Sequence, residues 1–263
     1  MAARLLAWCG WASADAVAEP HFPPESTLHP ELDALSSRLR RLSSTVVSDV
    51  LDRAGFPHQS LSAAIRPLAT GMKFAGAAAC FSGVTVYGES SGAKTLSPFE
   101  IDRAGAEGVV IVIAMNGHTM SAAIGGLMCL ALQRRGCAGV VVDGGARDVG
   151  EIIDLGLPVF CRYATPLISA GRWALTGARA PIRVTGQASE TVEIAPDDLI
   201  IGDADGAVVI PQALVEEITP LSVEQERLEA WIMTEIERGV ALPGLYPANA
   251  ETKARYEAFK RGQ

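Results

Sequence analysis

Residues 125–148 constrain the fold most, because they combine a helix signal with a buried-strand signal. A Gly-Gly pair precedes apolar residues at helical spacing, and Arg134, Arg135 and Gly136 follow them, as at the end of a helix. The run 137–142 is a short apolar strand of the kind that is covered on both faces in a parallel sheet. This stretch therefore predicts one helix–strand unit of an α/β sheet.

Helix and strand signals alternate on both sides of this unit. The clearest buried strand is 109–115, in which every residue except Met115 is Val, Ile or Ala. Short alternating units of this kind favour right-handed crossovers and a partly parallel sheet, so the sequence predicts an α/β core. We expect further strands at 74–80, 82–87 and 158–162 and helices at 45–54, 126–135 and 148–155.

The character of the chain changes after residue 180. Short strand signals at 182–184, 192–194, 199–202 and 207–210 predict a small β region packed on the same core. Residues 212–239 predict one or two polar helices broken by Pro220, and a charged helix is expected after Pro243. We therefore divide the chain into an irregular N-terminal extension (1–30), one α/β domain (31–211) and a C-terminal helical segment (212–263), which we expect to contact a neighbouring subunit.

The charge balance and the missing motifs argue against several classes of function. With 22 Lys and Arg residues against 30 Asp and Glu residues and no basic block, we expect no nucleic-acid ligand. No apolar run reaches the ~18 residues that a membrane-spanning helix needs, so we expect no membrane partner. The chain has no Gly-x-Gly-x-x-Gly motif, which argues against a nucleotide or S-adenosylmethionine cofactor bound in that way.

Cysteine usage and the N-terminal residues bear on the compartment. The five cysteines form no Cys-x-x-Cys pair, and four of them lie in apolar runs, which predicts reduced core thiols and a cytoplasmic protein. The first 20 residues faintly resemble a secretory signal, with Arg4 before an apolar run that ends at Trp11. That run is short and contains Cys9 and Gly10, so we expect a nonessential extension rather than a leader peptide.

The stretch 125–148 also carries the candidate site. A glycine at the helix start, near Gly126, lets an anion reach backbone N–H groups at the positive end of the helix dipole. Arg147 and Asp148 follow the strand 137–142 and its bounding Asp-Gly-Gly, where ligands of open α/β sheets usually bind. Arg147 can hold a carboxylate through two N–H groups, and Asp148 offers a hard oxygen ligand for a cation such as Mg²⁺. Together these groups suit a metal-bound α-keto acid.

Each of these residues also has a purely structural interpretation. Asp148 can cap the helix that follows it, while Arg147 can be a solvated surface residue or pair with Asp154. His118 is the only histidine inside the central α/β region, and a lone histidine suits a structural role better than a catalytic one. The segment 203–206, Asp-Ala-Asp-Gly, lacks the later ligands of a calcium loop, so we expect a tight turn between two strands.

The ordered set of motifs resembles the RraA-like family, which includes the 4-hydroxy-4-methyl-2-oxoglutarate aldolases that also decarboxylate oxaloacetate. The resemblance covers about residues 35–215, and it is specific through the order of its segments rather than through any one of them. The segments are 42–52 (LSSTVVSDVLD), 65–68 (IRPL), 125–148, 157–160 (LPVF), 165–166 (TP) and 196–206 (PDDLIIGDADG).

This resemblance implies a fold, a site and an activity. The fold is a swivelling β/β/α-type core, an α-β-β-α sandwich, assembled into homotrimers or homohexamers with the site near a subunit boundary. The activity is that of a class II, metal-dependent lyase, in which Mg²⁺ or Mn²⁺ stabilises a pyruvate enolate during retro-aldol cleavage or oxaloacetate decarboxylation. The alternative is a non-catalytic RraA-type regulator that binds a protein partner. The implied site comprises an anion cradle at Gly125, Gly126, Leu127 and Met128, a carboxylate and carbonyl clamp at Arg147, and a metal anchor at Asp148.

Position 126 departs from the family pattern. The aldolases usually carry Asp or Glu after the first glycine of the cradle, whereas this chain has Gly126. Candidates for the further acid that the family draws from its C-terminal segment are Glu224, Glu226 and Glu229. The departure bears on the aldol substrate more than on the binding of a metal or a keto acid.

Overall fold

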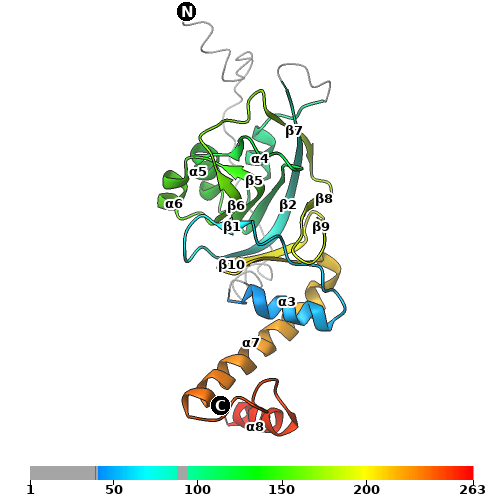
Figure 1. Ribbon diagram of the computed structural model, residues 1–263, viewed down its shortest axis with the longest axis vertical. Coiled ribbons are helices and arrows are strands. Elements are labelled where there is room, and N and C mark those ends of the chain that lie inside the picture. Colours follow the sequence, from blue (N-terminus) through cyan, green and yellow to red (C-terminus); the bar gives the residue numbers. More distant parts are fainter. Residues whose placement is uncertain (1–38, 40, 88–93, 263) are drawn as a thin grey trace, which may run out of the picture.

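The computed structural model describes residue 39 and residues 41–87 and 94–262, so the predicted extension and its leader-like segment lie outside the described residues. The largest element is a nine-stranded sheet with the order β1-β6-β5-β3-β2-β10-β11, to which β4 adds beside β5 and β7 beside β2 (Figure 1). Its strands are β1 (Arg66–Pro67), β2 (Phe74–Thr85), β3 (Val109–Ala114), β4 (Ala122–Ile124), β5 (Gly139–Ala146), β6 (Val159–Ala164), β7 (Trp173–Ala178), β10 (Leu199–Asp203) and β11 (Gly206–Ile210). A second sheet pairs β8 (Ile182–Thr185) with β9 (Thr191–Ile194).

The centre of the large sheet is parallel. Strands β2, β3, β5 and β6 run in one direction, which brings their carboxyl ends to the same edge. The Val- and Ile-rich sequence of β3 explains its central place, because its residues from Val110 to Ala114 have no exposed surface. Full burial of each such Val or Ile side chain contributes about 1.5–3 kcal/mol to folding.

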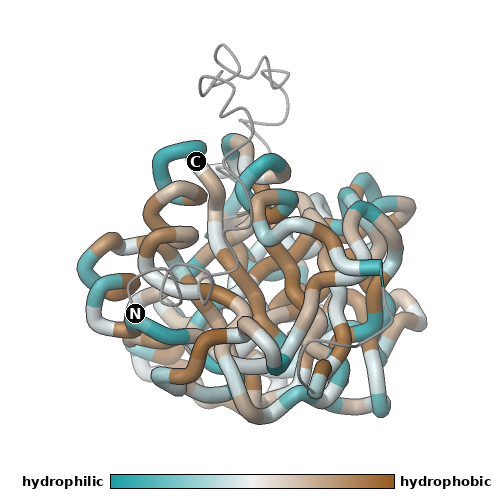
Figure 2. Tube along the Cα trace, turned by 90° about the horizontal axis from the view of Figure 1, so that it is seen from above, coloured by the Kyte–Doolittle hydropathy of each residue, from teal (hydrophilic) through white to brown (hydrophobic). Residues whose placement is uncertain are grey.

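The sheet is covered on both faces, as the alternation of side chains along β3 requires. Ile111 and Ile113 face a helical layer of α4 (Phe99–Ala104), α5 (Gly126–Arg134) and α6 (Val149–Leu155). Val110 and Val112 face the opposite way, in a cluster with the buried side chains of β8 and β9. Figure 2 shows the resulting distribution, with hydrophobic segments along the central strands and hydrophilic segments in peripheral loops.

Helices also cover the edge of the sheet formed by β10 and β11, and they form the predicted C-terminal arm. Helix α3 (Ser44–Arg53) packs on β10 and β11 together with the start of α7 (Val215–Glu237), which follows the short 3-10 turn η1 (Gln212–Leu214). The rest of α7 leads away from the sheet and carries α8 (Ala250–Arg261) on its own small core (Figure 1). The predicted α/β class with a C-terminal helical arm is thus confirmed. Among the described residues, no helix combines the length and apolarity that crossing a membrane requires.

Two predicted interruptions are wrong. The strands expected at 74–80 and 82–87 form the single strand β2, in which a bulge at Ser82 and Gly83 takes up the irregularity. The break expected at Pro220 is also absent, because α7 runs unbroken through it. The proline removes one helical N–H donor, but Ile218 and Ser222 on either side have no exposed surface and anchor the helix.

The tight turn at 203–206 is confirmed and has an additional role. Asp203 pairs with Gly206 at the end of the β10–β11 hairpin. The Asp203 carboxylate also accepts hydrogen bonds from the backbone N–H of Ser44 (2.7 Å) and from its hydroxyl (2.6 Å), at the N-terminus of α3. The turn therefore fixes α3 on the hairpin, a contact that the local sequence pattern did not indicate.

Candidate functional site

Residues 143–146 belong to β5, so this strand extends beyond the end at residue 142 that the sequence predicted. A Cβ atom on Gly144 would lie 2.2 Å from the sulfur of Met115, and one on Gly145 would lie 2.5 Å from the ring of Tyr163. These glycines therefore allow close packing inside the sheet rather than a chain reversal. Because β5 continues to Ala146, Arg147 and Asp148 come directly at the carboxyl edge of the parallel strands.

Asp148 points toward α5 rather than capping α6. Its backbone is left-handed (φ 58°, ψ 39°), a conformation that Asp tolerates better than most residues and that often marks functional positions. It occupies the N-cap position of α6, but its side chain makes no capping hydrogen bond there. Instead its Oδ2 accepts a hydrogen bond of 3.0 Å from the backbone N–H of Gly126. The helix-cap interpretation of this carboxylate is therefore wrong.

Arg147 pairs with its neighbour and not with Asp154. Its Nε lies 3.3 Å from Oδ2 of Asp148, and the two side chains are 35% and 33% exposed. Its backbone N–H donates to the carbonyl of Ile124 (3.1 Å), which ties the residue to β4 just before α5 begins. The guanidinium is thus positioned by the fold and still open to solvent, as binding of a soluble anion requires.

The residues predicted for the cradle lie at the start of α5. Gly125 is the N-cap, and a Cβ atom there would lie 2.6 Å from Oδ2 of Asp148 and 3.0 Å from Nε of Arg147, so a larger residue would require these side chains to move. Asp148 already accepts the Gly126 N–H, whereas the N–H groups of Leu127 and Met128 follow in the first helical turn, where no intrahelical acceptor exists. The structure thus brings all six residues of the predicted site together.

Glu151 is a neighbour of this site that the sequence reasoning missed. It lies in the first turn of α6, and its Oε2 lies 2.3 Å from the point that a Cβ atom on Gly126 would occupy. Glu151 follows Asp148 by three residues, a spacing that places two side chains on one face of a helix, so the sequence could have indicated that they lie close together. Only the packing of α6 beside α5 shows that this face looks toward the cradle.

The three acidic candidates of the C-terminal segment lie elsewhere in the chain. Glu226 accepts the backbone N–H of Ser43 (3.2 Å), Glu224 pairs with Lys260 (2.6 Å), and Glu229 accepts from Gln225 (2.6 Å). Their helix α7 lies below the sheet in Figure 1, away from α5 and α6, which lie beside β5 and β6. Within one chain these acids therefore do not complete the site.

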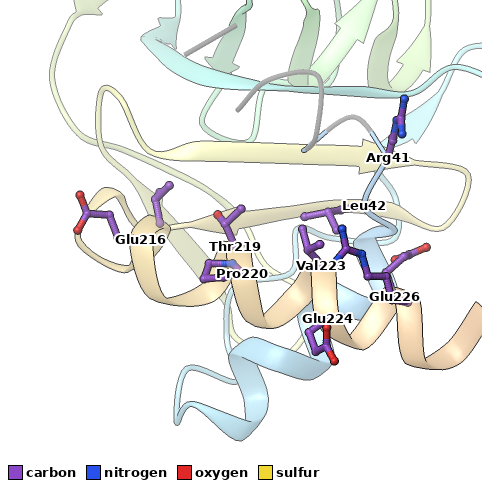
Figure 3. A pocket seen from close by; sticks show the side chains of 10 residues that line it. Arg41, Leu42, Glu216, Thr219, Pro220, Val223, Glu224 and Glu226 are labelled. Atoms are coloured by element: carbon purple, nitrogen blue, oxygen red, sulfur yellow. The ribbon is translucent and has the colours of Figure 1, made fainter. Parts of the chain in front are cut away.

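A cavity of about 730 Å³ lies along α7, between its N-terminal half and the residues that precede α3. Figure 3 shows Glu224 and Glu226 beside it, with Arg41 and Leu42 across from the helix. The Arg147–Asp148 pair and the α5 cradle do not line it. The cavity therefore lies apart from the residues that the sequence predicted for the cradle, the clamp and the metal anchor.

His118 supports the site rather than reacting in it. The side chain is 3% exposed, and its Nε2 accepts from the backbone N–H of Ser121 (3.0 Å), which leaves Nδ1 to donate to Thr85 Oγ1 (3.0 Å). Burial lowers the pKa of His118 and so favours this neutral form. The histidine thereby fixes the loop between β3 and β4, the strand that leads into α5.

The cysteines of the described region are core residues. Cys80, Cys129, Cys137 and Cys161 are all free and buried, as predicted, whereas Cys9 lies outside the described residues. Burial raises the pKa of the Cys129 thiol to about 12, and the negative charge of Asp148 acts in the same direction. A thiol in that state is a poor nucleophile and a poor metal ligand.

The donor set of the site fits a hard divalent cation. Among the described residues, no group of three or more His, Cys, Asp or Glu side chains is arranged to hold a metal, so a zinc-type cage has no basis there. Mg²⁺ differs, because it usually binds through one or two carboxylates and keeps several water ligands. A carboxylate on a partly exposed sheet edge, such as Asp148, matches that requirement.

Comparisons with known proteins identify the family of the chain. The family model for the RraA-like proteins, described as Aldolase/RraA, matches residues 44–209. The "Putative 4-hydroxy-4-methyl-2-oxoglutarate aldolase" of Halalkalibacterium halodurans is 31% identical over 188 residues, which cover 72% of this chain and 81% of that protein. Protein DlpA of Legionella pneumophila is 28% identical over 92% of this chain, but this match spans only 38% of DlpA.

A solved structure shares the fold. Streptomyces coelicolor RraAS2, described as an unusual member of the RNase ES inhibitor RraA protein family, aligns with a TM-score of 0.68 and 27% identity. The alignment covers 79% of this chain and 98% of that chain.

Proposed function

The chain belongs to the RraA-like family, and from this premise we propose that it is a lyase that cleaves a C–C bond of a small α-keto acid with a divalent cation. The observation that carries the proposal is the convergence at Gly125, where Asp148 Oδ2 and Arg147 Nε lie 2.6 and 3.0 Å from the Cβ position. A cation ligand, a carboxylate clamp and free helix N–H groups thus meet at one point.

Each residue of the site has a separate role in the proposed reaction. Arg147 binds the carboxylate and keto oxygen of the substrate through its planar set of donors. The N–H groups of Leu127 and Met128, at the positive end of α5, bind the remaining negative charge. Asp148 would hold Mg²⁺ or Mn²⁺, which supplies Lewis-acid stabilisation of the charge that develops on the keto oxygen as the C–C bond breaks. Arg147 stabilises the same developing charge from the side of the cradle.

The substrate proposal follows the named relative. We propose 4-hydroxy-4-methyl-2-oxoglutarate or oxaloacetate as the substrate, with pyruvate as the common product. The test measures pyruvate release from each compound by purified protein with added Mg²⁺ or Mn²⁺, beside an active homologue. A metal-only reaction is the blank, because free cations also promote decarboxylation of oxaloacetate.

Variants connect that activity to the site. Arg147→Ala and Asp148→Ala should each remove most of the pyruvate release, whereas Arg103→Ala should not, because Arg103 is an exposed residue that pairs with Glu100 on α4. If the wild-type protein releases no pyruvate while the homologue does, the lyase proposal is abandoned.

A regulatory function is the second candidate, favoured by the similarity to RraAS2. In that case the chain binds a protein partner, and the Arg147–Asp148 pair is dispensable. Retention of partner binding in Arg147→Ala and Asp148→Ala, together with its loss on changes to the surface elsewhere, would favour the regulator over the lyase.

We also propose a cytoplasmic homotrimer or homohexamer in which the arm contacts a neighbouring subunit. The arm exposes large apolar side chains that a partner surface would cover, including Leu221 (50% exposed), Met233 (63%) and Leu242 (52%). Light scattering on the purified protein measures the mass, and Met233→Glu should lower it if the arm is an interface.

A further inference from the structure

The side chains of Glu151 and Asp148 both lie against Gly126, in the first turn of α5. Oε2 of Glu151 lies 2.3 Å from the point that a Cβ atom on Gly126 would occupy, and Oδ2 of Asp148 accepts the backbone N–H of Gly126 at 3.0 Å. Gly126 is buried and carries no side chain there, so the Glu151 carboxylate takes the space. Any larger residue at 126 would displace this carboxylate from the cradle.

The two carboxylates differ in how their charges are balanced. Asp148 has the Arg147 guanidinium (3.3 Å) and the Gly126 N–H (3.0 Å) as partners. Glu151 is exposed, and within the part of the chain that the structure describes no cationic side chain pairs with it. Two negative charges and one positive charge therefore leave a net negative charge on the open side of the site. Such a site favours a cation over a second anion.

We propose that Glu151 is a second cation-binding carboxylate of this site, opposite Asp148 across Gly126. This inference rests on the proposed function, because it concerns the same divalent cation. Mg²⁺ and Mn²⁺ take oxygen ligands, and Mg²⁺ is commonly held by one or two carboxylates with water in its other positions. Asp148 supplies one such group and Glu151 supplies the other, either directly or through a bound water.

The first test is Mn²⁺ affinity, measured without substrate by calorimetric titration or by the electron paramagnetic resonance signal of free Mn²⁺. Glu151→Gln keeps the size of the side chain and should weaken Mn²⁺ binding by about 10-fold or more, as loss of a supporting metal contact usually does. Asp154→Asn is the matched control, because Asp154 is an exposed acid of the same helix and should leave the affinity unchanged.

A swap of positions gives the sharper test. In the double variant Gly126→Asp with Glu151→Ala, the new carboxylate starts from the point that Glu151 now occupies, so Mn²⁺ affinity should recover from the level of Glu151→Ala toward that of wild type. Recovery supports a cation-binding role, since a general structural role of Glu151 would not be rescued from another helix. Circular dichroism on each variant confirms that the fold is retained.

The outcomes separate this inference from the proposed function. If the wild-type protein binds Mn²⁺ and releases pyruvate while Glu151→Gln binds Mn²⁺ as tightly as Asp154→Asn, the role of Glu151 is refuted and the lyase proposal stands. If the wild-type protein neither binds Mn²⁺ nor releases pyruvate, both are refuted.

Discussion

Gly125→Ala tests whether the cradle, the clamp and the cation ligand act as one unit. The added Cβ atom would lie 2.6 Å from Oδ2 of Asp148 and 3.0 Å from both Cγ and Nε of Arg147. Ordinary contact begins at 3.4 Å, so the Asp148 carboxylate must move away by most of an ångström while Arg147 moves less. Misplacement of a reacting group by about 1 Å typically costs about 100-fold in rate, and we expect a loss of that order in kcat/KM for pyruvate release.

Stability should change much less than activity. The displaced Asp148 loses its charge-assisted hydrogen bond to Gly126, but the side chain is 33% exposed, so water replaces much of that interaction. We expect a cost of about 1 kcal/mol and a fall in Tm of about 2–4 °C. Pyruvate release, Mn²⁺ affinity and thermal unfolding are measured on the same preparations.

Gly150→Ala is the matched control. Gly150 lies in α6 between Asp148 and Glu151, and a Cβ atom there would meet nothing within 4 Å. The change should stabilise the helix by about 0.5–1 kcal/mol and leave activity unaltered. If Gly125→Ala keeps wild-type activity and Mn²⁺ affinity, the side chains around Gly125 do not form the site and the reasoning fails.

Three further predictions concern stability and the cation. Burial lowers the pKa of His118 below the ordinary 6.5. The stability that the neutral histidine contributes is therefore complete above about pH 6.5 and is lost as the pH falls toward the pKa of the folded state. The Tm of the wild-type protein should fall over this pH range, and the Tm of His118→Gln should fall less steeply. Asp143 is 7% exposed, pairs with Arg162 and accepts hydrogen bonds from the backbone N–H (2.9 Å) and hydroxyl (2.8 Å) of Thr185. Asp143→Ala should therefore lower the free energy of unfolding, measured by urea titration, by about 3 kcal/mol. An unchanged free energy of unfolding would contradict this prediction. Chelation with EDTA should abolish pyruvate release and added Mn²⁺ should restore it, whereas activity that persists through exhaustive chelation would refute a cation-dependent reaction.

Local sequence patterns predict the regular elements well because each element here obeys its own periodicity. The run of Val, Ile and Ala at 109–114 is short and rich in β-branched residues, which favours a strand covered on both faces, and the apolar spacing of 126–134 with basic residues at its end is that of a helix. The failures occur where tertiary packing overrides a local signal. The predicted strand ends at residue 142 before two glycines, but β5 continues through Gly144, where the absent side chain leaves room for the sulfur of Met115.

The candidate site could be predicted only in part for the same reason. Arg147 and Asp148 follow a recognisable strand, so their place at the sheet edge follows from the sequence. The direction of the Asp148 side chain does not, because it depends on a left-handed backbone that the local pattern leaves open. Glu151 depends on a contact between two helices, which no spacing along one helix reveals.

Gly125 and Gly126 leave space that side chains from neighbouring segments fill. Gly125 leaves the space in which the side chains of Arg147 and Asp148 lie, and Gly126 leaves room for a carboxylate that comes from α6. An acid at 126 in the presence of Glu151 would bring a third negative charge to the same point, where the dipole of α5 offsets only about 0.3–1 kcal/mol per carboxylate. The absence of a side chain at Gly126 and the presence of Glu151 are therefore coupled. The close packing of α6 on α5 lets α6, rather than α5, supply the acidic side chain.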